Sequence, residues 1–202
     1  MSTKIDVYVD YVCPYCFLVE DAIEEVKGDR DVEVEVKPFE LRPDPVPTLR
    51  PEDDYLPRVW RDSVYPMAER LGIDITLPTV SPQPRTEKAF MVFQLAKQKG
   101  LAEEYSEAMF KAFFQQDRNI GLDEVIIEVA ESVGLDRKDV ESALTDEALR
   151  DKHRAELEHA VKNLHVNSVP SVFVNGELVR GVPSASRLKS VVDNASQGQR
   201  TG

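Results

Sequence analysis

The chain has 202 residues, of which 42% are hydrophobic, and a formal net charge of -12 at pH 7. This length is enough to bury a core, and no apolar run approaches the ~20 residues of a membrane span. The acidic balance argues against binding to nucleic acid or anionic membranes, because neutralising phosphates requires clustered Lys and Arg. The N-terminus, "MSTKIDVYVDY", lacks the apolar stretch of a secretory signal, which predicts a cytoplasmic protein.

A strand, a helix and a second strand are predicted in the first fifth of the chain. Apolar residues alternate over residues 5–11 and again over 32–41, as in strands. Between them they recur at helical spacing from Pro14 to about residue 26, and proline is tolerated in the first turn of a helix. A right-handed crossover would make the two strands parallel.

The middle of the chain is predicted to be mainly helical. The proline-dense segment "RPDPVPTLRP" (42–51) excludes a helix or a central strand, and helical periodicity then continues to about residue 164, interrupted by a loop at 77–84. The C-terminal part returns to strand patterning around Asn175-Gly176, a pair that favours a two-residue hairpin turn. A last helix follows, and the tail "SQGQRTG" is expected to fray.

This element order predicts the fold class. Strand, helix and strand, then helix, hairpin and helix, are the element order of a thioredoxin-like α/β fold with a large all-helical insertion. We assign residues 1–43 plus 146–202 to the thioredoxin-like domain and residues 44–145 to the helical insertion domain.

The two cysteines of the chain, Cys13 and Cys16, are separated by Pro-Tyr. As a structural disulfide they would close a very short loop and restrain the unfolded chain by only ~2 kcal/mol. A zinc site would need further ligands. The three histidines, His153, His159 and His165, are spaced six residues apart and therefore point in three directions around a helix. We predict no metal, and interpret His153 as a packed core residue.

A redox role accounts for more of the local sequence. At the start of a helix, Cys13 would lie near unpaired N–H groups and the positive end of the dipole, which favour the thiolate. The thiolate is the species that attacks disulfides. Cys16, one turn further along, is expected to be more buried. We therefore predict that Cys13 forms a mixed disulfide and that Cys16 resolves it.

A second segment, "NSVPSVFVNG", places Pro170 directly before a predicted strand. Proline cannot donate a hydrogen bond to a strand ladder, so it is expected only at a strand start or edge. By itself Pro170 indicates no more than the end of a loop.

Five segments occur in one order along the chain: "VDYVCPYC", "PFELRPD", "EAMFKAFFQQDRNIG", "VAESVGLD" and "VPSVFVNG". In this order the chain resembles the DsbA-like thiol-disulfide oxidoreductases. More narrowly, it resembles their FrnE-type branch, which is related to kappa-class glutathione transferases and 2-hydroxychromene-2-carboxylate isomerases.

The resemblance implies roles for named residues. Cys13 would be the nucleophile, Cys16 the resolving thiol, and Pro170 a cis-proline facing them. Val169 would position an extended peptide substrate by strand addition. Asp10 matches an acidic position of the family, for which we favour a structural role over tuning of the thiol. The implied enzyme is a protein disulfide oxidoreductase or isomerase whose redox-active disulfide replaces any cofactor, with a low-molecular-weight thiol as an alternative co-substrate.

The chain departs from the family where relatives often have glycine near the cis-proline, since Asn167 and Ser168 occur here. Relatives that act as transferases or isomerases usually have serine in place of the first cysteine, so two cysteines favour dithiol chemistry. Two alternatives stay open: a glutathione-transferase-like or isomerase-like enzyme acting on a small molecule, and a non-catalytic chaperone. The direction of the redox reaction, its potential, its physiological substrate and the oligomeric state are not predicted.

Overall fold

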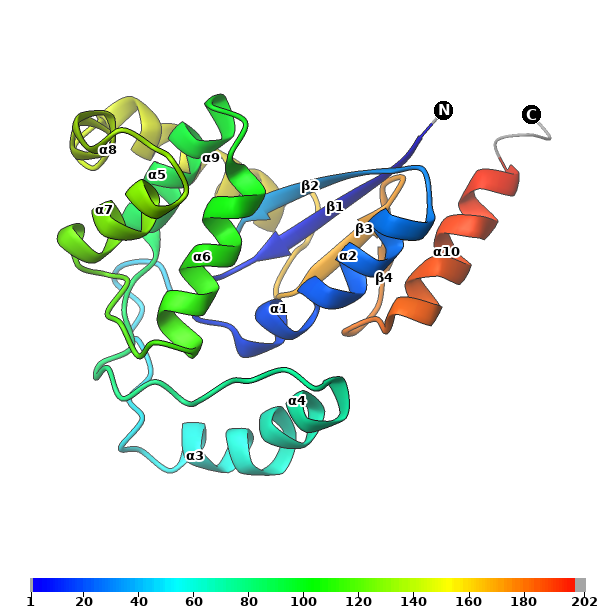
Figure 1. Cartoon of the computed structure of the whole chain (residues 1–202), viewed down its shortest axis with the longest axis horizontal. Coiled ribbons are helices and arrows are strands. Elements are labelled where there is room, and N and C mark those ends of the chain that lie inside the picture. The colour runs from blue at the N-terminus through cyan, green and yellow to red at the C-terminus, as the bar shows by residue number, and fades with distance from the viewer. Residues whose placement is uncertain (1, 199–202) are drawn as a thin grey trace.

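A mixed four-stranded sheet forms the centre of the computed structural model, which describes residues 2–198. Its strands are β1 (Thr3–Val9), β2 (Val32–Pro38), β3 (Ser171–Val174) and β4 (Glu177–Val179), in the order β2-β1-β3-β4. β1 and β2 are parallel, as the crossover predicts, and β3 is antiparallel to both β1 and β4. Segments from the two ends of the chain therefore lie side by side (Figure 1).

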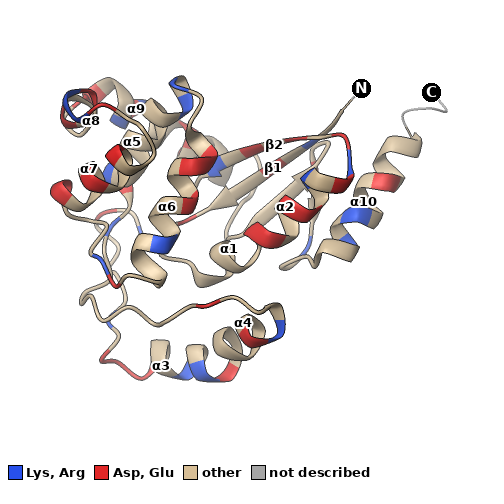
Figure 2. Cartoon of the chain, in the orientation of Figure 1, with Lys and Arg blue, Asp and Glu red and all other residues tan. Residues whose placement is uncertain are grey.

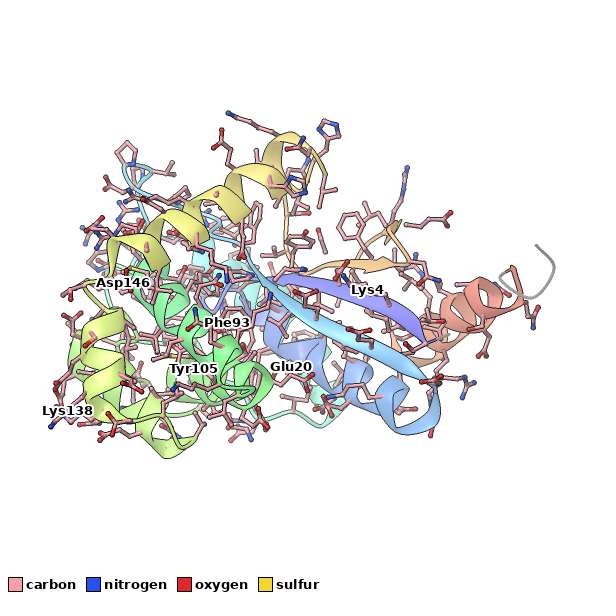
Figure 3. All side chains as sticks on the ribbon, turned by 90° about the horizontal axis from the view of Figure 1, so that it is seen from above. Lys4, Glu20, Phe93, Tyr105, Lys138 and Asp146 are labelled. Atoms are coloured by element: carbon pink, nitrogen blue, oxygen red, sulfur yellow. The ribbon has the colours of Figure 1, made fainter. Side chains whose placement is uncertain are left out.

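The two faces of the sheet are covered by different helices. Ile5, Val7 and Val9 alternate along β1 and are buried on the face covered by α1 (Pro14–Leu18), α2 (Glu20–Asp29) and α10 (Ala185–Gly198). Tyr8 lies on the other face, in a smaller cluster with Phe173 and with residues of α9 (Glu147–Lys162). Figure 3 shows α9 and α2 on opposite sides of the sheet.

The remaining helices connect β2 to α9, as the sequence predicts. They are α3 (Tyr55–Val59), a π-helical turn η1 (Trp60–Val64), α4 (Tyr65–Leu71), α5 (Glu87–Gln98), α6 (Ala102–Phe114), α7 (Asp123–Ser132) and α8 (Arg137–Ala143). α3 and α4 lie next to the end of the molecule where α1 begins (Figure 1). The predicted domain boundaries, at residues 43/44 and 145/146, fall in the connections before α3 and α9, and the division itself stays a prediction.

Several predicted element ends were wrong. β1 ends at Val9 and not at residue 11, because the Asp10 carbonyl accepts the Cys13 N–H in a turn (3.0 Å). β2 ends at Pro38 and not at residue 41, and the Leu41 N–H instead donates to the Asp10 side chain. The first predicted helix is divided at Val19 into α1 and α2.

At the C-terminus the predicted hairpin is confirmed. Asn175 and Gly176 connect β3 to β4 with φ values of 49° and 84°, the left-handed geometry that a type I′ turn requires. α10 reaches Gly198, so residues 196–198, which were expected to fray, are helical. Residues 199–202 lie outside the described residues.

The insertion and the sheet share one core. Tyr11, just after β1, is fully buried, with its ring 4.6 Å from that of Phe90 and 5.2 Å from that of Phe110. The Tyr11 and Ser106 hydroxyls share a hydrogen bond of 2.9 Å. Helices α5 and α6 are therefore anchored directly beside the cysteine segment. None of the helices in residues 2–198 has the length and apolar character needed to cross a membrane.

Candidate active site

The two cysteines lie at the turn between β1 and α1. Cys13 is the residue before α1, with extended backbone (φ -92°, ψ 114°), and Pro14 occupies the first turn of the helix. Both cysteines are free thiols. Cys13 is 5% exposed and Cys16 is fully buried. The expected difference in burial is present but small. Little of the Cys13 side chain is therefore accessible to a substrate.

The structure brings Cys13 next to Val169, although 156 residues separate them in sequence. The Cys13 thiol donates to the Val169 carbonyl oxygen at 3.5 Å, within the range of hydrogen bonds that involve sulfur. The Val169–Pro170 peptide bond is cis, and buried Pro170 directly precedes β3. Asn167 and Ser168, which precede this pair, are exposed.

The two thiols have different environments. Burial raises the pKa of the Cys16 thiol well above its ordinary value, and the hydrogen bond with the Cys13 side chain raises it further. Cys16 is therefore held as a thiol at neutral pH. Such a group is inert until its proton is removed, which suits a resolving rather than an attacking sulfur.

Asp10 links three parts of the chain beneath this turn. It is 1% exposed, and its two carboxylate oxygens accept from the Leu41 N–H (2.8 Å) and from the Thr86 hydroxyl (2.8 Å). Burial raises the pKa of Asp10 to about 6, although these hydrogen bonds oppose the shift. The predicted structural role fits this geometry, because the carboxylate connects β1, the segment after β2 and the start of α5.

A buried pair that sequence reasoning did not identify lies nearby. His153 Nε2 is 2.6 Å from Glu40 Oε1, and both side chains are almost completely buried. The His153 ring also stacks on Phe90 at 5.3 Å. His153 is thus the packed, hydrogen-bonded residue that the sequence predicts, but nothing in the sequence marks Glu40, 113 residues away, as its partner.

The insertion contacts the active-site helix through Tyr15. Its hydroxyl donates to Ser63 Oγ in η1 at 2.6 Å, which connects the dipeptide between the cysteines to the α3–α4 segment. Beside Cys13 and Val169, this segment borders a cavity of about 260 Å³. Arg42 and Arg85 also line the cavity, and sequence reasoning did not identify either of them.

A larger cavity, of about 570 Å³, lies between α2 and α6 and is bordered by Cys16. Glu20, at the start of α2 (Figure 3), also lines it, and burial raises the pKa of Glu20 to about 8, with the Glu107 carboxylate contributing. Other carboxylates here are paired, Glu103 with Lys27 and Glu107 with Lys111. Cys13 does not line this cavity, so we place the chemistry at the smaller one.

Comparisons with known proteins are consistent with this geometry. Residues 4–193 match the family model of the DSBA-like thioredoxin domain. The uncharacterized protein YwbO of Bacillus subtilis (strain 168) is 43% identical over 195 residues, which cover 96% of this chain and 98% of YwbO.

Two solved structures show the same fold. A probable DsbA oxidoreductase from Streptomyces coelicolor aligns with a TM-score of 0.79 and 24% identity, over 96% of this chain and 90% of that chain. A 2-hydroxychromene-2-carboxylate isomerase aligns with a TM-score of 0.75 and 17% identity, over 98% and 97%. At these identities the likeness concerns the fold alone.

Proposed function

We propose a function on the premise that this chain belongs to the DsbA-like thioredoxin-domain family, as the family match and the relative at 43% identity establish. Membership supports an oxidoreductase. We infer that this one exchanges thiols with disulfides of proteins or peptides, with Cys13 as the nucleophile and Cys16 as the resolving thiol. The narrower placement in the FrnE-type branch and the cytoplasmic location stay predictions.

The proximity of Cys13 to Val169 carries this proposal. The Cys13 sulfur lies 3.5 Å from the backbone carbonyl oxygen of Val169, which only Pro170 separates from β3, so an extended chain paired along Val169 would pass within reach of the thiol. Such pairing is indifferent to substrate sequence, since it uses main-chain hydrogen bonds. It therefore suits an enzyme that acts on disulfides in different proteins.

The reaction proceeds in two steps. The Cys13 thiolate attacks one sulfur of the substrate disulfide, the substrate S–S bond breaks, and its second half leaves as a thiolate. Cys16 then attacks the Cys13 sulfur and releases the first half, while the Cys16 proton passes to the thiolate already released. The substrate gains two electrons, and the protein is left with a Cys13–Cys16 disulfide. The reverse sequence oxidises a dithiol.

Cysteine variants test this proposal. Cys13→Ser should abolish reduction of a peptide disulfide, because the remaining thiol, Cys16, is fully buried and protonated. Cys16→Ser should accumulate a mixed disulfide between Cys13 and the substrate, detectable by mass spectrometry of the intact protein. Disulfide exchange that continues undiminished in Cys13→Ser would disprove the proposal.

A small-molecule reaction is the second candidate, favoured by the cavity of about 260 Å³ beside Cys13. Here a low-molecular-weight thiol would be the co-substrate. Incubation with a panel of electrophiles and chromene carboxylates, with and without added glutathione, tests this candidate. Turnover that depends on glutathione and survives in Cys16→Ser would support it, whereas the absence of turnover would exclude these substrates.

A further inference from the structure

The cavity beside Cys13 is composed of an apolar wall and a basic side. The wall comes mainly from the insertion, through Leu49, Tyr55, Leu56, Val59, Trp60 and Pro84. The volume, about 260 Å³, is just below the range of about 300–1,000 Å³ typical of small-molecule sites. It therefore suits one apolar group of amino-acid size close to the sulfur that Cys13 attacks.

Of the two arginines that line the cavity, Arg85 is held within the protein. Its guanidinium donates to the carbonyl oxygens of Arg42 and Val46, both at 2.9 Å, and lies 3.5 Å from Asp44. These contacts fix the loop after β2 against the segment before α5. Arg85 consequently has a structural role that needs no ligand.

The Arg42 guanidinium is different, because within residues 2–198 no carboxylate or carbonyl accepts a hydrogen bond from it. Lys and Arg are interspersed with Asp and Glu over the elements (Figure 2), and most of these cations have a carboxylate within 4 Å. Arg42 is half-buried and lines the cavity without such a partner. A guanidinium is always charged, so Arg42 adds a positive charge at the cavity that no carboxylate in residues 2–198 pairs with.

The acidic residue that lines the cavity forms no ion pair with Arg42. Asp10 is buried, and its two carboxylate oxygens are engaged by the Leu41 N–H and the Thr86 hydroxyl. A carboxylate supplied by a ligand would fit the guanidinium with two parallel hydrogen bonds and would restore the missing charge pair.

We propose that this cavity selects disulfide substrates that carry an apolar group and a carboxylate next to the sulfur attacked by Cys13, with Arg42 binding the carboxylate. This inference rests on the proposed exchange function and adds the class of substrate to it. The carboxylate belongs either to an acidic residue beside the cysteine of a peptide or to a small organic disulfide, and both sources present the same chemistry to Arg42.

The rates of reaction with two chromogenic disulfides test the inference. 5,5′-Dithiobis(2-nitrobenzoate) has a carboxylate on each aromatic ring, and 2,2′-dithiodipyridine is aromatic and neutral. Second-order rate constants are measured for the reduced protein by stopped flow at 0.15 M salt, which screens distant charges. The comparison is between the wild type, Arg42→Gln and the control Arg58→Gln. Arg58 is an exposed residue of α3 that does not line the cavity.

We expect Arg42→Gln to slow the reaction with the dianionic disulfide by about 10-fold, because a charge-assisted pair is lost. The slowing of the reaction with the neutral disulfide should be smaller by a factor of at least about 5. Arg42→Lys should recover part of the loss. Arg58→Gln should affect both disulfides equally. An equal loss with both disulfides in Arg42→Gln, or a loss no larger than in Arg58→Gln, would overturn the inference.

A wild-type protein that reacts with both disulfides no faster than Cys13→Ser would instead disprove the exchange function itself. Peptide disulfides with Glu or Gln beside the cysteine form the second arm. A preference for Glu that disappears in Arg42→Gln would identify a peptide carboxylate, and selectivity confined to the aromatic dianion would identify a small disulfide. Either result supports the inference.

Discussion

At the scale of single residues, Asp10 is the group whose ionisation the structure controls most directly. It lies beneath the cysteine turn, and its burial opposes the charged form. Folding raises the pKa of Asp10. The group therefore contributes its full stability below the unfolded pKa of 3.8, and this contribution is lost as the pH rises through the folded pKa of about 6. This loss amounts to about 3 kcal/mol.

Asp10→Asn should therefore stabilise the protein at pH 8 but not at pH 4. An asparagine can accept from the Leu41 N–H and donate to the Thr86 hydroxyl, so it keeps both contacts without a charge. We expect a gain of about 1–3 kcal/mol at pH 8, measured by urea unfolding at both pH values. Asp10→Ala is the control, and it should destabilise at both pH values because two buried donors lose their partner. An equal effect of Asp10→Asn at pH 4 and pH 8 would refute this account.

The sequence marks some residues of the site and not others. Cys13 and Cys16 stand out as the two cysteines of the chain, and Pro170 stands out because a proline directly before a strand is unusual. Thr86 and Arg42 carry no such mark. Their places depend on how the insertion folds back over the sheet, which local patterns do not determine.

At the scale of elements, the alternation of apolar residues and the residue types of turns were sufficient to predict the structure where the local sequence determines it. β2 and the Asn175-Gly176 hairpin follow from strand periodicity and from positive φ at the turn. Element ends were harder to predict, because contacts distant in sequence set them. The end of β2 at Pro38 could not be predicted, because the Leu41 N–H donates to the side chain of Asp10, 31 residues away in sequence.

The N-terminus of α9 allows a test at this scale, because one side chain caps it (Figure 3). Asp146 accepts from the N–H groups of Ala148 (2.8 Å) and Leu149 (3.4 Å). Asp146→Ala should cost about 1 kcal/mol of unfolding free energy, measured by urea denaturation. The matched control is Asp151→Ala, at an exposed position inside the same helix, with an expected effect below about 0.5 kcal/mol. Equal costs for the two variants would show that the cap contributes nothing.

At the scale of the whole molecule, the thioredoxin-like sheet and the helical insertion are joined by aromatic packing. The Phe110 ring lies 5.2 Å from that of Tyr11 and 5.8 Å from that of Phe17, so a residue of α6 packs on both sides of the cysteine turn. Further along α6, Phe114 lies 5.8 Å from Trp60 in η1. A core that is continuous in this way leaves neither part with a complete apolar core of its own.

The chain should therefore unfold in a single cooperative transition. Trp60 is the only tryptophan, so its fluorescence reports on the insertion, while far-UV circular dichroism reports on the whole chain. The two midpoints in urea should coincide, as for a two-state domain. Phe110→Ala should lower the unfolding free energy by about 3–5 kcal/mol and shift both midpoints together. Leu178→Ala, at a 53% exposed position of β4, should shift neither by more than about 0.5 kcal/mol. If fluorescence changed well before circular dichroism, the insertion would unfold independently, and the shared core would not couple it to the sheet.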